Sequence, residues 1–358
     1  MRPPDICIAG AGIIGLSLAL NLYSRGYRVT VLEQATPLGE ASTAAAGMLA
    51  AADPENPSEL RALADLSLSL YPSFLESLHE LSGLQVPFQT HTTLQTIPAN
   101  SVAPADVLTP EDLSHLLPTI HSGEHRFLLL KEDSLDPRQL AEALRAAVKA
   151  TSIDLRPNTR VLSTVDRGEA LEIRSTRGSI AAAKFIDCTG AWSASTSPLS
   201  SLRITPKKGQ MLYLVLPLEL PLRLVVRTHE IYIVPRTTGP NAGRAVVGAT
   251  VEDAGFDKTL HASDLAHLRS LASSLLPPLA NAAQLDAWAG LRPATADSLP
   301  IFGALPGRPN HLLATGHFRN GILLAPATAH VMAQWIAGEL PSIDLTHFSP
   351  DRLMAGRA

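Results

Sequence analysis

The sequence contains little cysteine, few aromatic residues and few charged residues. Of its 358 residues only Cys7 and Cys188 are cysteines, while aromatic residues make up 4% and charged residues 17%. Two cysteines exclude a disulfide framework, leave no cluster for a structural zinc site and fit a reducing compartment. The 12 histidines are scattered and form no His-Glu-x-x-His pair, so we expect no metal centre.

The balance of charge excludes further functional classes. The chain has 29 basic and 33 acidic residues, so its formal charge is −4, and no basic stretch favours nucleic acid or an anionic membrane surface. Because 46% of the residues are hydrophobic, the chain can bury a large core. At roughly 150 residues per domain, it has room for about two domains and one deep cleft.

An uncharged run near the N-terminus, residues 6–23, has two interpretations. Its length would suit a membrane helix or the apolar part of a secretory signal. However, Asp5 stands where a signal peptide has a basic flank, and Gly10, Gly12 and Gly15 interrupt the run at defined spacing. We therefore interpret the run as a buried strand, a glycine turn and a helix. A soluble cytoplasmic protein without a targeting or membrane-spanning segment is expected.

The glycines lie within a predicted β-α-β unit. Residues 5–9 predict a buried parallel strand, residues 16–24 predict a helix that ends near Gly26, and residues 27–32 predict a second strand that leads to Glu33. This context gives a Gly-x-Gly-x-x-Gly pattern its meaning as a dinucleotide-binding turn.

Each residue of the turn has a physical role. Gly10 makes the tight turn, Gly12 leaves room for a pyrophosphate, and Gly15 lets helix and strand pack closely. The helix N-terminus presents free N–H groups and partial positive charge to the phosphates. Glu33 can accept two ribose hydroxyls and would repel a 2′-phosphate, which argues against NADP. The turn alone does not separate FAD from NAD.

The remainder of the chain alternates between helical and strand-like stretches. Helices are predicted at residues 59–81, 138–150, 264–276 and 322–337, with Pro326 in the first turn of the last helix or at a kink. Strands are predicted within 84–130, as hairpins at 154–180, and at 184–188, 210–216, 222–226, 229–235, 244–250 and 311–315. Small residues fill 39–52, which suggests backbone lying close against a flat cofactor.

The order of these stretches predicts an α/β fold. Both ends of the chain belong to the nucleotide-binding unit, whereas the middle is rich in strands. We predict a nucleotide-binding domain that is segmented in the sequence, with an inserted α+β substrate domain built on an antiparallel sheet. The predicted segments are 1–84, 133–203 and 292–358 for the first domain, and 85–132 and 204–291 for the second.

Further segments carry a family resemblance. They are STAAAGML at 42–49, TGAW at 189–192, Lys208-Gly209, YIVPR at 232–236, VGAT at 247–250, WAGLRP at 288–293 and GHFRNGILLAP at 316–326. Together with the glycine turn, their order resembles the glycine oxidase branch of the D-amino-acid oxidase family of FAD-dependent oxidoreductases. The resemblance implies a Rossmann-like FAD-binding domain. It also implies oxidation of glycine to iminoacetate, which feeds the thiazole ring of thiamine.

The resemblance implies a set of FAD-binding residues. They comprise Gly10, Gly12, Ile13, Ile14 and Gly15 at the phosphates, Glu33 and Gln34 at the ribose, Ala41, Ser42, Ala46, Gly47 and Met48 along the cofactor, Val161 at the adenine, Gly190 near the pyrophosphate, and His317, Phe318, Arg319, Asn320, Gly321, Ile322 and Leu323 around the flavin ring. Non-covalent FAD is expected, because no cysteine follows Cys188 and no histidine lies near Ser42.

Arg292, Tyr232 and Arg319 are the predicted substrate residues. A guanidinium forms bidentate pairs with a carboxylate, and the flanking Gly290 and Pro293 suggest a bend at a cleft. The alternatives are a structural salt bridge for Arg292, a sheet-interior position for Tyr232, and a helix cap or an acid partner for Arg319. Hydride loss from the substrate α-carbon to a flavin requires no strong base, which fits a sequence with no evident His-Asp pair.

One position departs from the family pattern. Val251 follows VGAT where a typical glycine oxidase has methionine, so we expect that sarcosine, N-ethylglycine or small D-amino acids are accepted beside glycine. The alternatives to a glycine oxidase that uses O2 and releases H2O2 are a broader D-amino-acid or sarcosine oxidase, a dehydrogenase with another electron acceptor, and a non-catalytic FAD-binding subunit. The resemblance also suggests a homo-oligomer, since family members are often tetramers.

Overall fold

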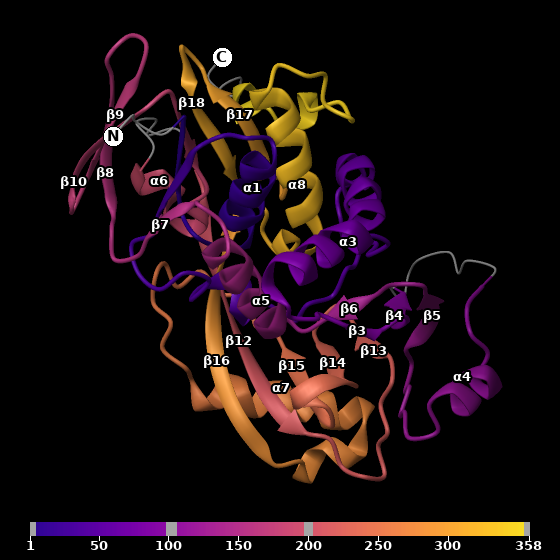
Figure 1. The fold of residues 1–358 in the computed structure, drawn as a ribbon. Coiled ribbons are helices and arrows are strands. Elements are labelled where there is room, and N and C mark those ends of the chain that lie inside the picture. The colour runs from indigo at the N-terminus through magenta and orange to yellow at the C-terminus, as the bar shows by residue number, and fades with distance from the viewer. Residues whose placement is uncertain (1–4, 98–105, 197–202, 354–358) are drawn as a thin grey trace.

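Two sheets stacked along the long axis of the molecule organise the fold (Figure 1). The computed structural model describes residues 5–97, 106–196 and 203–353, so the predicted domain ends at residues 1 and 358 lie outside the described residues. The six-stranded sheet lies in the upper half of Figure 1 and the seven-stranded sheet in the lower half. The predicted domain boundaries themselves stay a prediction.

The six-stranded sheet has the order β17-β18-β11-β1-β2-β7. The strands are β1 (Ile6–Ala9), β2 (Val29–Leu32), β7 (Asp154–Arg156), β11 (Lys184–Asp187), β17 (Ile301–Leu305) and β18 (Arg308–Thr315). All pairs are parallel except β17 with β18. β1 is buried on both faces, because Ile6 and Ile8 join one hydrophobic core and Cys7 and Ala9 another. This explains the apolar run without alternation.

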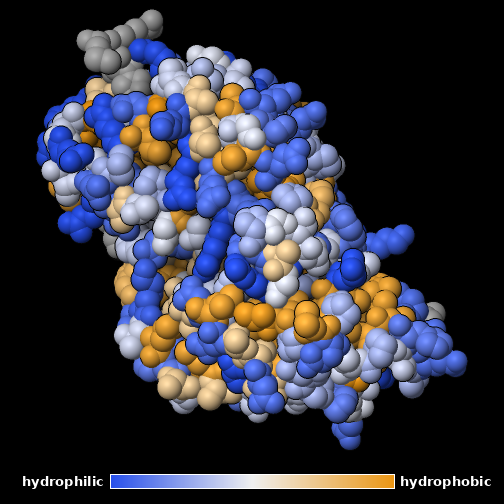
Figure 2. Space-filling view, turned by 60° about the horizontal axis from the view of Figure 1, so that its bottom comes forward, coloured by the Kyte–Doolittle hydropathy of each residue, from blue (hydrophilic) through white to orange (hydrophobic). Residues whose placement is uncertain are grey.

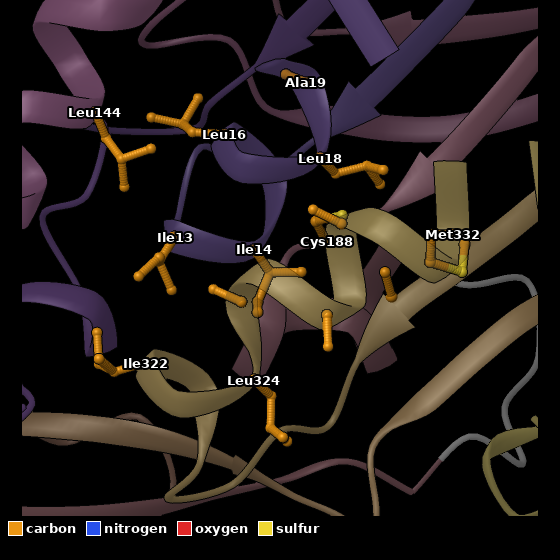
Figure 3. Close-up of a cluster of buried hydrophobic side chains, with 14 of the residues drawn as sticks. Ile13, Ile14, Leu16, Leu18, Ala19, Leu144, Cys188, Ile322, Leu324 and Met332 are labelled. Atoms are coloured by element: carbon orange, nitrogen blue, oxygen red, sulfur yellow. The ribbon is translucent and has the colours of Figure 1, made fainter. Parts of the chain in front are cut away.

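Four helices cover one face of this sheet. They are α1 (Ile13–Ser24), α3 (Arg61–Ser82), α5 (Pro137–Lys149) and α8 (Gly321–Ile336). In the core, Ile13 and Ile14 of α1 lie toward side chains of α8, while Leu16 lies beside Leu144 of α5 (Figure 3). On the other face pack the antiparallel strands β8 (Val161–Asp166), β9 (Leu171–Ser175) and β10 (Gly178–Ala182).

The helix α1 begins three residues earlier than predicted. Gly12 is its N-cap, and the N–H of Leu16 already donates to the Gly12 carbonyl at 3.0 Å. The apolar periodicity did not indicate this start, because all residues of the first turn, including Gly15, are buried and show no polar face. The strand β7 also departs from the prediction, since it pairs in parallel with β2 and forms no hairpin.

Pro326 is the sixth residue of α8 and lies inside the helix, beyond the first turn, which was one of the two predicted places for it. A proline there cannot donate to the carbonyl four residues earlier, which belongs to Ile322. The hydroxyl of Tyr71, from α3, donates to that carbonyl instead at 2.5 Å. Ser67, one turn earlier in α3, donates to Leu323 O at 2.6 Å and accepts from Ala327 N at 3.2 Å. Two side chains of α3 thus form hydrogen bonds with the backbone of α8 where the proline interrupts the helical pattern.

The seven-stranded sheet has the order β16-β12-β15-β14-β13-β4-β5. Its strands are β4 (Thr93–Ile97), β5 (Arg126–Leu130), β12 (Thr205–Val215), β13 (Val225–Arg227), β14 (Tyr232–Arg236), β15 (Arg244–Gly248) and β16 (Gln284–Ala294). All neighbours are antiparallel except β4 with β13. The helix α7 (Ala262–Leu275) packs on one face, and the other face looks toward the six-stranded sheet.

Several elements of this half were not predicted. The helix α4 (Pro110–Leu116) is short and begins at a capping box formed by Thr109 and Asp112. The edge strand β16 was not predicted, and it continues through Gly290 and Pro293 without interruption. Pro293 is tolerated because an edge strand has one unpaired side, and its cross-strand partner is another proline, Pro206.

The outer surface of the molecule is mixed in character. Apolar residues gather in a band across the lower half of Figure 2, whereas hydrophilic residues dominate the upper half. Within the described ranges, no helix is both long enough and apolar enough to cross a membrane. The same ranges hold no group of three or more histidine, cysteine, aspartate or glutamate residues that could bind a metal ion.

Candidate active site

A cavity of about 560 Å³ lies between the two sheets. The carboxyl ends of β1, β2 and β11 line one part of it, and β12, β14 and β16 of the seven-stranded sheet line another. Ligand sites in open α/β sheets lie outside the carboxyl ends of the strands. A cavity of this size is typical of sites for cofactors and small molecules.

The glycine turn forms one end of this cavity. Gly10 has a φ of +97°, and a Cβ there would lie 2.4 Å from the Cys188 carbonyl oxygen. A Cβ on Gly15 would lie 2.0 Å from the Gly10 carbonyl oxygen, so α1 packs directly on the turn. Gly15 does not line the cavity, whereas Gly10 and Gly12 do. The turn therefore places the N-terminus of α1 at the cavity with no side chain on Gly10 or Gly12 in the way, as a pyrophosphate requires.

Two side chains contact this turn from other segments. The N–H of Ile13 donates to Ser42 Oγ at 2.9 Å, and the N–H of Ala11 donates to Glu33 Oε2 at 2.8 Å. The other oxygen of Glu33 accepts from Ala35 N at 2.9 Å. Glu33 thus stands at the end of β2 with its carboxylate fixed beside the turn. This is where a ribose would lie next to bound phosphates.

The segment after the short helix α2 (Ala41–Ala44) crosses the middle of the cavity. Gly47 has a φ of +92°, and a Cβ there would lie 2.0 Å from the Leu135 carbonyl oxygen. A Cβ on Gly290 of β16 would approach Ala44 Cβ to 2.6 Å. Small residues therefore let this segment pass between the two sheets, and Ala46, Gly47 and Met48 line the cavity.

The N-terminal end of α8 forms the adjoining wall. His317, Phe318, Arg319, Asn320, Gly321 and Ile322 line the cavity, whereas Leu323 points into the core. His317 is 3% exposed, and its Nε2 lies 3.1 Å from Thr328 Oγ1. Burial lowers the pKa of His317 to about 3, so its ring is neutral at physiological pH. The helix end itself supplies partial positive charge to the cavity.

Arg292 projects from β16 over Gly209 of β12. A Cβ on Gly209 would lie 2.3 Å from Arg292 Nη1, so the guanidinium occupies the space that a side chain at position 209 would take. The Nη1 group donates to the Thr250 carbonyl at 3.2 Å. In the part of the chain that the structure describes, Arg292 forms no ion pair with a carboxylate. The alternative of a structural salt bridge for Arg292 is therefore not observed among the described residues.

Tyr232 lies beside Arg292 on the cavity face. Burial raises the pKa of Tyr232, and the nearby charge and hydrogen bond of Arg292 only partly offset that effect. Its hydroxyl is thus a protonated donor at neutral pH. A Cβ on the opposite residue, Gly248, would lie 2.7 Å from this hydroxyl. Arg292 and Tyr232 together can accommodate one carboxylate.

Arg319 is held differently from Arg292. Its Nη1 donates to Glu55 Oε2 at 2.6 Å, and its Nη2 lies 3.5 Å from Asp53 Oδ2. The neighbouring Asn320 donates to Asn56 Oδ1 at 2.9 Å. The alternative of an acid partner for Arg319 is thus realised. Arg319 lines the cavity while it fastens the 53–56 segment to α8.

The sequence analysis missed Arg227. It stands directly opposite Tyr232 across the β13–β14 pair, is 4% exposed and lines the cavity. Its Nη2 lies 3.0 Å from Glu132 Oε2, and its Nε donates to Gln95 Oε1 and lies 3.9 Å from Asp53 Oδ2. The predicted strand 222–226 ended one residue before it. A lone arginine at the end of an apolar strand was the available signal.

Comparisons with known proteins assign this cavity to a family. The family model described as "FAD dependent oxidoreductase" matches residues 5–335. The chain belongs to this family. FAD is therefore the cofactor, and the small residues of the glycine turn and of the 46–48 segment leave space along the cavity wall that fits a group of this kind. The family match confirms the predicted cofactor, the predicted enzyme class and the Rossmann-like α/β fold with an additional sheet.

Relatives within this family confirm the resemblance to the glycine oxidase branch. The bifunctional protein ThiO/ThiG of Trichormus variabilis is 34% identical over 97% of this chain, although the chain spans only 55% of that relative. The glycine oxidase of Pseudomonas aeruginosa is 31% identical, with 96% of this chain and 98% of that protein covered. The crystal structure of glycine oxidase from Geobacillus kaustophilus has a TM-score of 0.88 at 28% identity and covers 98% of both chains.

Proposed function

We propose that this FAD-dependent oxidoreductase oxidises glycine and other small amino acids or amines that carry one carboxylate. The single observation that carries the proposal is the Arg292 guanidinium, which lies in the cavity beside the Tyr232 hydroxyl without a carboxylate partner among the described residues. A substrate carboxylate completes this arrangement. The relatives known as glycine oxidases support the same class of substrate.

The residues of the chain bind and orient, and they provide little acid–base chemistry. Bound FAD supplies the acceptor for two electrons. Arg292 and Tyr232 hold the substrate carboxylate and so fix the direction of its α-carbon. The neutral His317 places no positive charge in the cavity, while the N-terminal end of α8 stabilises negative charge on the group next to it. The other cavity-lining residues that the sequence predicts to bind FAD have the same role, which is to bind and orient the cofactor.

The overall reaction balances with oxygen as the co-reactant. Glycine loses one hydride from its α-carbon and one proton from its amine to give iminoacetate, and O2 takes up the two electrons and two protons as H2O2. Water then converts free iminoacetate to glyoxylate and ammonia. The relative named ThiO/ThiG supports the inference that iminoacetate is supplied to thiazole formation in thiamine biosynthesis.

A broader substrate range is the second candidate. Val251 lines the cavity and is 66% exposed, so the wall next to Arg292 is short and open. This favours acceptance of sarcosine, N-ethylglycine and small D-amino acids beside glycine. A homo-oligomer and a cytoplasmic location stay predictions.

A peroxide assay on the purified holoenzyme tests the proposal. We expect release of H2O2 with glycine, sarcosine and D-alanine, and none with propylamine, which has no carboxylate. If glycine reduces the flavin but the reduced form persists in air and is reoxidised only by an artificial acceptor, the enzyme is a dehydrogenase. If no member of the panel reduces the flavin, the proposed substrate class is wrong.

A further inference from the structure

Lys208 is a fully buried cation on the reverse side of the substrate wall. It precedes Gly209 in β12, so its side chain points away from the cavity while Gly209 faces it. Its side chain is 0% exposed, and its Nζ lies 3.0 Å from Glu252 Oε2. A buried ammonium carries a large desolvation cost, so its presence beneath the cavity wall requires a partner.

Glu252 is the partner, and it holds a short segment of chain against β12. The backbones of Lys208 and Glu252 exchange hydrogen bonds of 3.0 and 2.9 Å. The carboxylate also accepts from Gln210 Nε2 at 2.9 Å and from the Thr250 hydroxyl. Burial alone would raise the pKa of Glu252, but hydrogen bonds from Gln210, Thr250 and Lys208 outweigh it and lower the pKa. Glu252 therefore stays ionised.

Thr250 connects this network to the cavity. Its hydroxyl accepts from Gln210 N at 2.8 Å on the buried side, while its carbonyl accepts from Arg292 Nη1 at 3.2 Å. Between Thr250 and Glu252, Val251 lines the cavity. The position of the Arg292 guanidinium thus depends on a segment that the Lys208–Glu252 pair fixes from behind.

We propose that Lys208 is a positioning residue for Arg292, acting through Glu252 and the Thr250 carbonyl. Without the ammonium, the Glu252 carboxylate loses its buried counter-charge and turns toward water, and the 250–252 segment moves with it. Arg292 then loses the carbonyl that orients its fork, although it keeps its charge. The inference rests on the proposed role of Arg292 in binding the substrate carboxylate.

Paired substitutions in the holoenzyme test this relay. For Lys208→Met we expect the KM for glycine and the Kd for acetate, read from perturbation of the flavin spectrum, to rise about three- to tenfold, as loss of one oriented hydrogen bond predicts. The value of kcat and the FAD content should stay within about twofold of wild type. Lys149→Met is the control, because it removes the same charge from an exposed lysine in the last turn of α5. We expect it to leave all four quantities unchanged.

A double-variant cycle separates positioning from general destabilisation. If Lys208 acts through Arg292, Lys208→Met will not raise the KM further in an Arg292→Ala background. Additive effects, or equal effects of the Lys149 and Lys208 substitutions, would overturn the inference. An Arg292→Ala variant with unchanged KM would instead overturn the proposed carboxylate site.

A milder substitution serves if Lys208→Met does not fold. Thr250→Val keeps the carbonyl and removes the hydroxyl that ties it to Glu252 and Gln210. We expect a smaller rise in KM, about two- to fivefold, that is again absent in the Arg292→Ala background. A KM equal to that of wild type would show that the relay does not set the position of Arg292.

Discussion

The two ends of the cavity are built on opposite principles. At the cofactor end the decisive feature is missing atoms, since a Cβ on Gly10, Gly15 or Gly47 would lie within 2.4 Å of a carbonyl oxygen. At the substrate end the decisive feature is charged atoms held in place, since Arg227 and Arg292 flank Tyr232 on one face of a sheet. The cofactor end therefore fails when atoms are added, whereas the substrate end also fails when charged atoms are removed.

This difference follows from what each ligand offers the protein. A pyrophosphate is recognised by backbone N–H groups, which every residue carries, so the protein must clear side chains from its path. A single small carboxylate offers little surface for contact, so its recognition requires a side chain with two parallel donors. The predictions below test this contrast, beginning with the largest effect.

Gly10→Ala should abolish the folded holoenzyme. The new methyl group would lie 2.4 Å from the Cys188 carbonyl oxygen, and the φ of +97° is strained for alanine. Because β1 and β11 are fully buried partners, neither strand can move aside. We expect purified protein, where any is recovered, to be colourless, as judged by flavin absorbance per chain.

Gly26→Ala is the control for this substitution. Gly26 has a φ of +86° but nothing within 4 Å of the added methyl group. It should cost only about 1–2 kcal/mol of strain in the free energy of unfolding and retain full FAD. Equal loss of FAD in both variants would show that backbone strain, rather than lack of space, dominates at the turn.

Arg292→Ala should raise the KM for glycine at least about tenfold, since a hydrogen bond to a charged group contributes about 1.5–3 kcal/mol. The FAD content should not change, because the hydrogen bond of Arg292 goes to the Thr250 carbonyl and not to the glycine turn. Steady-state peroxide assays and flavin absorbance measure both quantities. Arg292→Lys should recover the KM only in part, because lysine lacks the planar fork. Loss of FAD without a change in KM would remove the distinction between the two ends.

The cofactor end was largely predictable from the sequence. Glycine spacing, an apolar strand and a carboxylate at the end of the next strand are local signals, and β1, α1 and β2 formed as predicted apart from the early start of α1. Each of these signals lies within a few residues of the feature it predicts. Gly15 shows the limit, because its role in the close packing of helix and strand was predicted, whereas its absence from the cavity lining was not.

The substrate end was less predictable, because its geometry depends on strand register. Arg227 meets Tyr232 only through the pairing of β13 with β14, and Lys208 meets Glu252 only through an isolated bridge. A register shift of one residue would move each side chain to the other face of the sheet. The acid partners of Arg319 come from a segment 264 residues away, which no local pattern could indicate.

The stability of the cofactor end should depend on pH, whereas the arginines keep their charge. His317 is neutral in the folded protein because burial lowers its pKa to about 3. The unfolded chain, with a histidine pKa of about 6.5, takes up the proton first. The contribution of His317 to the free energy of unfolding should therefore be fully present above about pH 6.5. Below that pH the free energy of unfolding should fall by about 1.4 kcal/mol per pH unit.

Urea unfolding at about pH 7 and about pH 5.5, above the main range of carboxylate titration, measures this slope. His311, whose pKa burial lowers to about 4, contributes with the same sign. His317→Asn should reduce the slope, and the exposed His79→Gln should leave it unchanged. A stability that rises as the pH falls over this interval would contradict the assignment of neutral His317.

Glu55→Gln should have the smallest effect, although Glu55 contacts an arginine that lines the same cavity. Both partners are partly exposed, with side-chain exposures of 31% for Arg319 and 45% for Glu55, and such pairs contribute about 0–1 kcal/mol. Arg319 also keeps Asp53 at 3.5 Å, so its position does not depend on Glu55 alone. We expect kcat/KM for glycine to change by less than about threefold and the urea midpoint to shift only slightly. A tenfold loss of kcat/KM would mean that Arg319, like Arg292, needs a fixed position, and the substrate end would then extend to the N-terminus of α8.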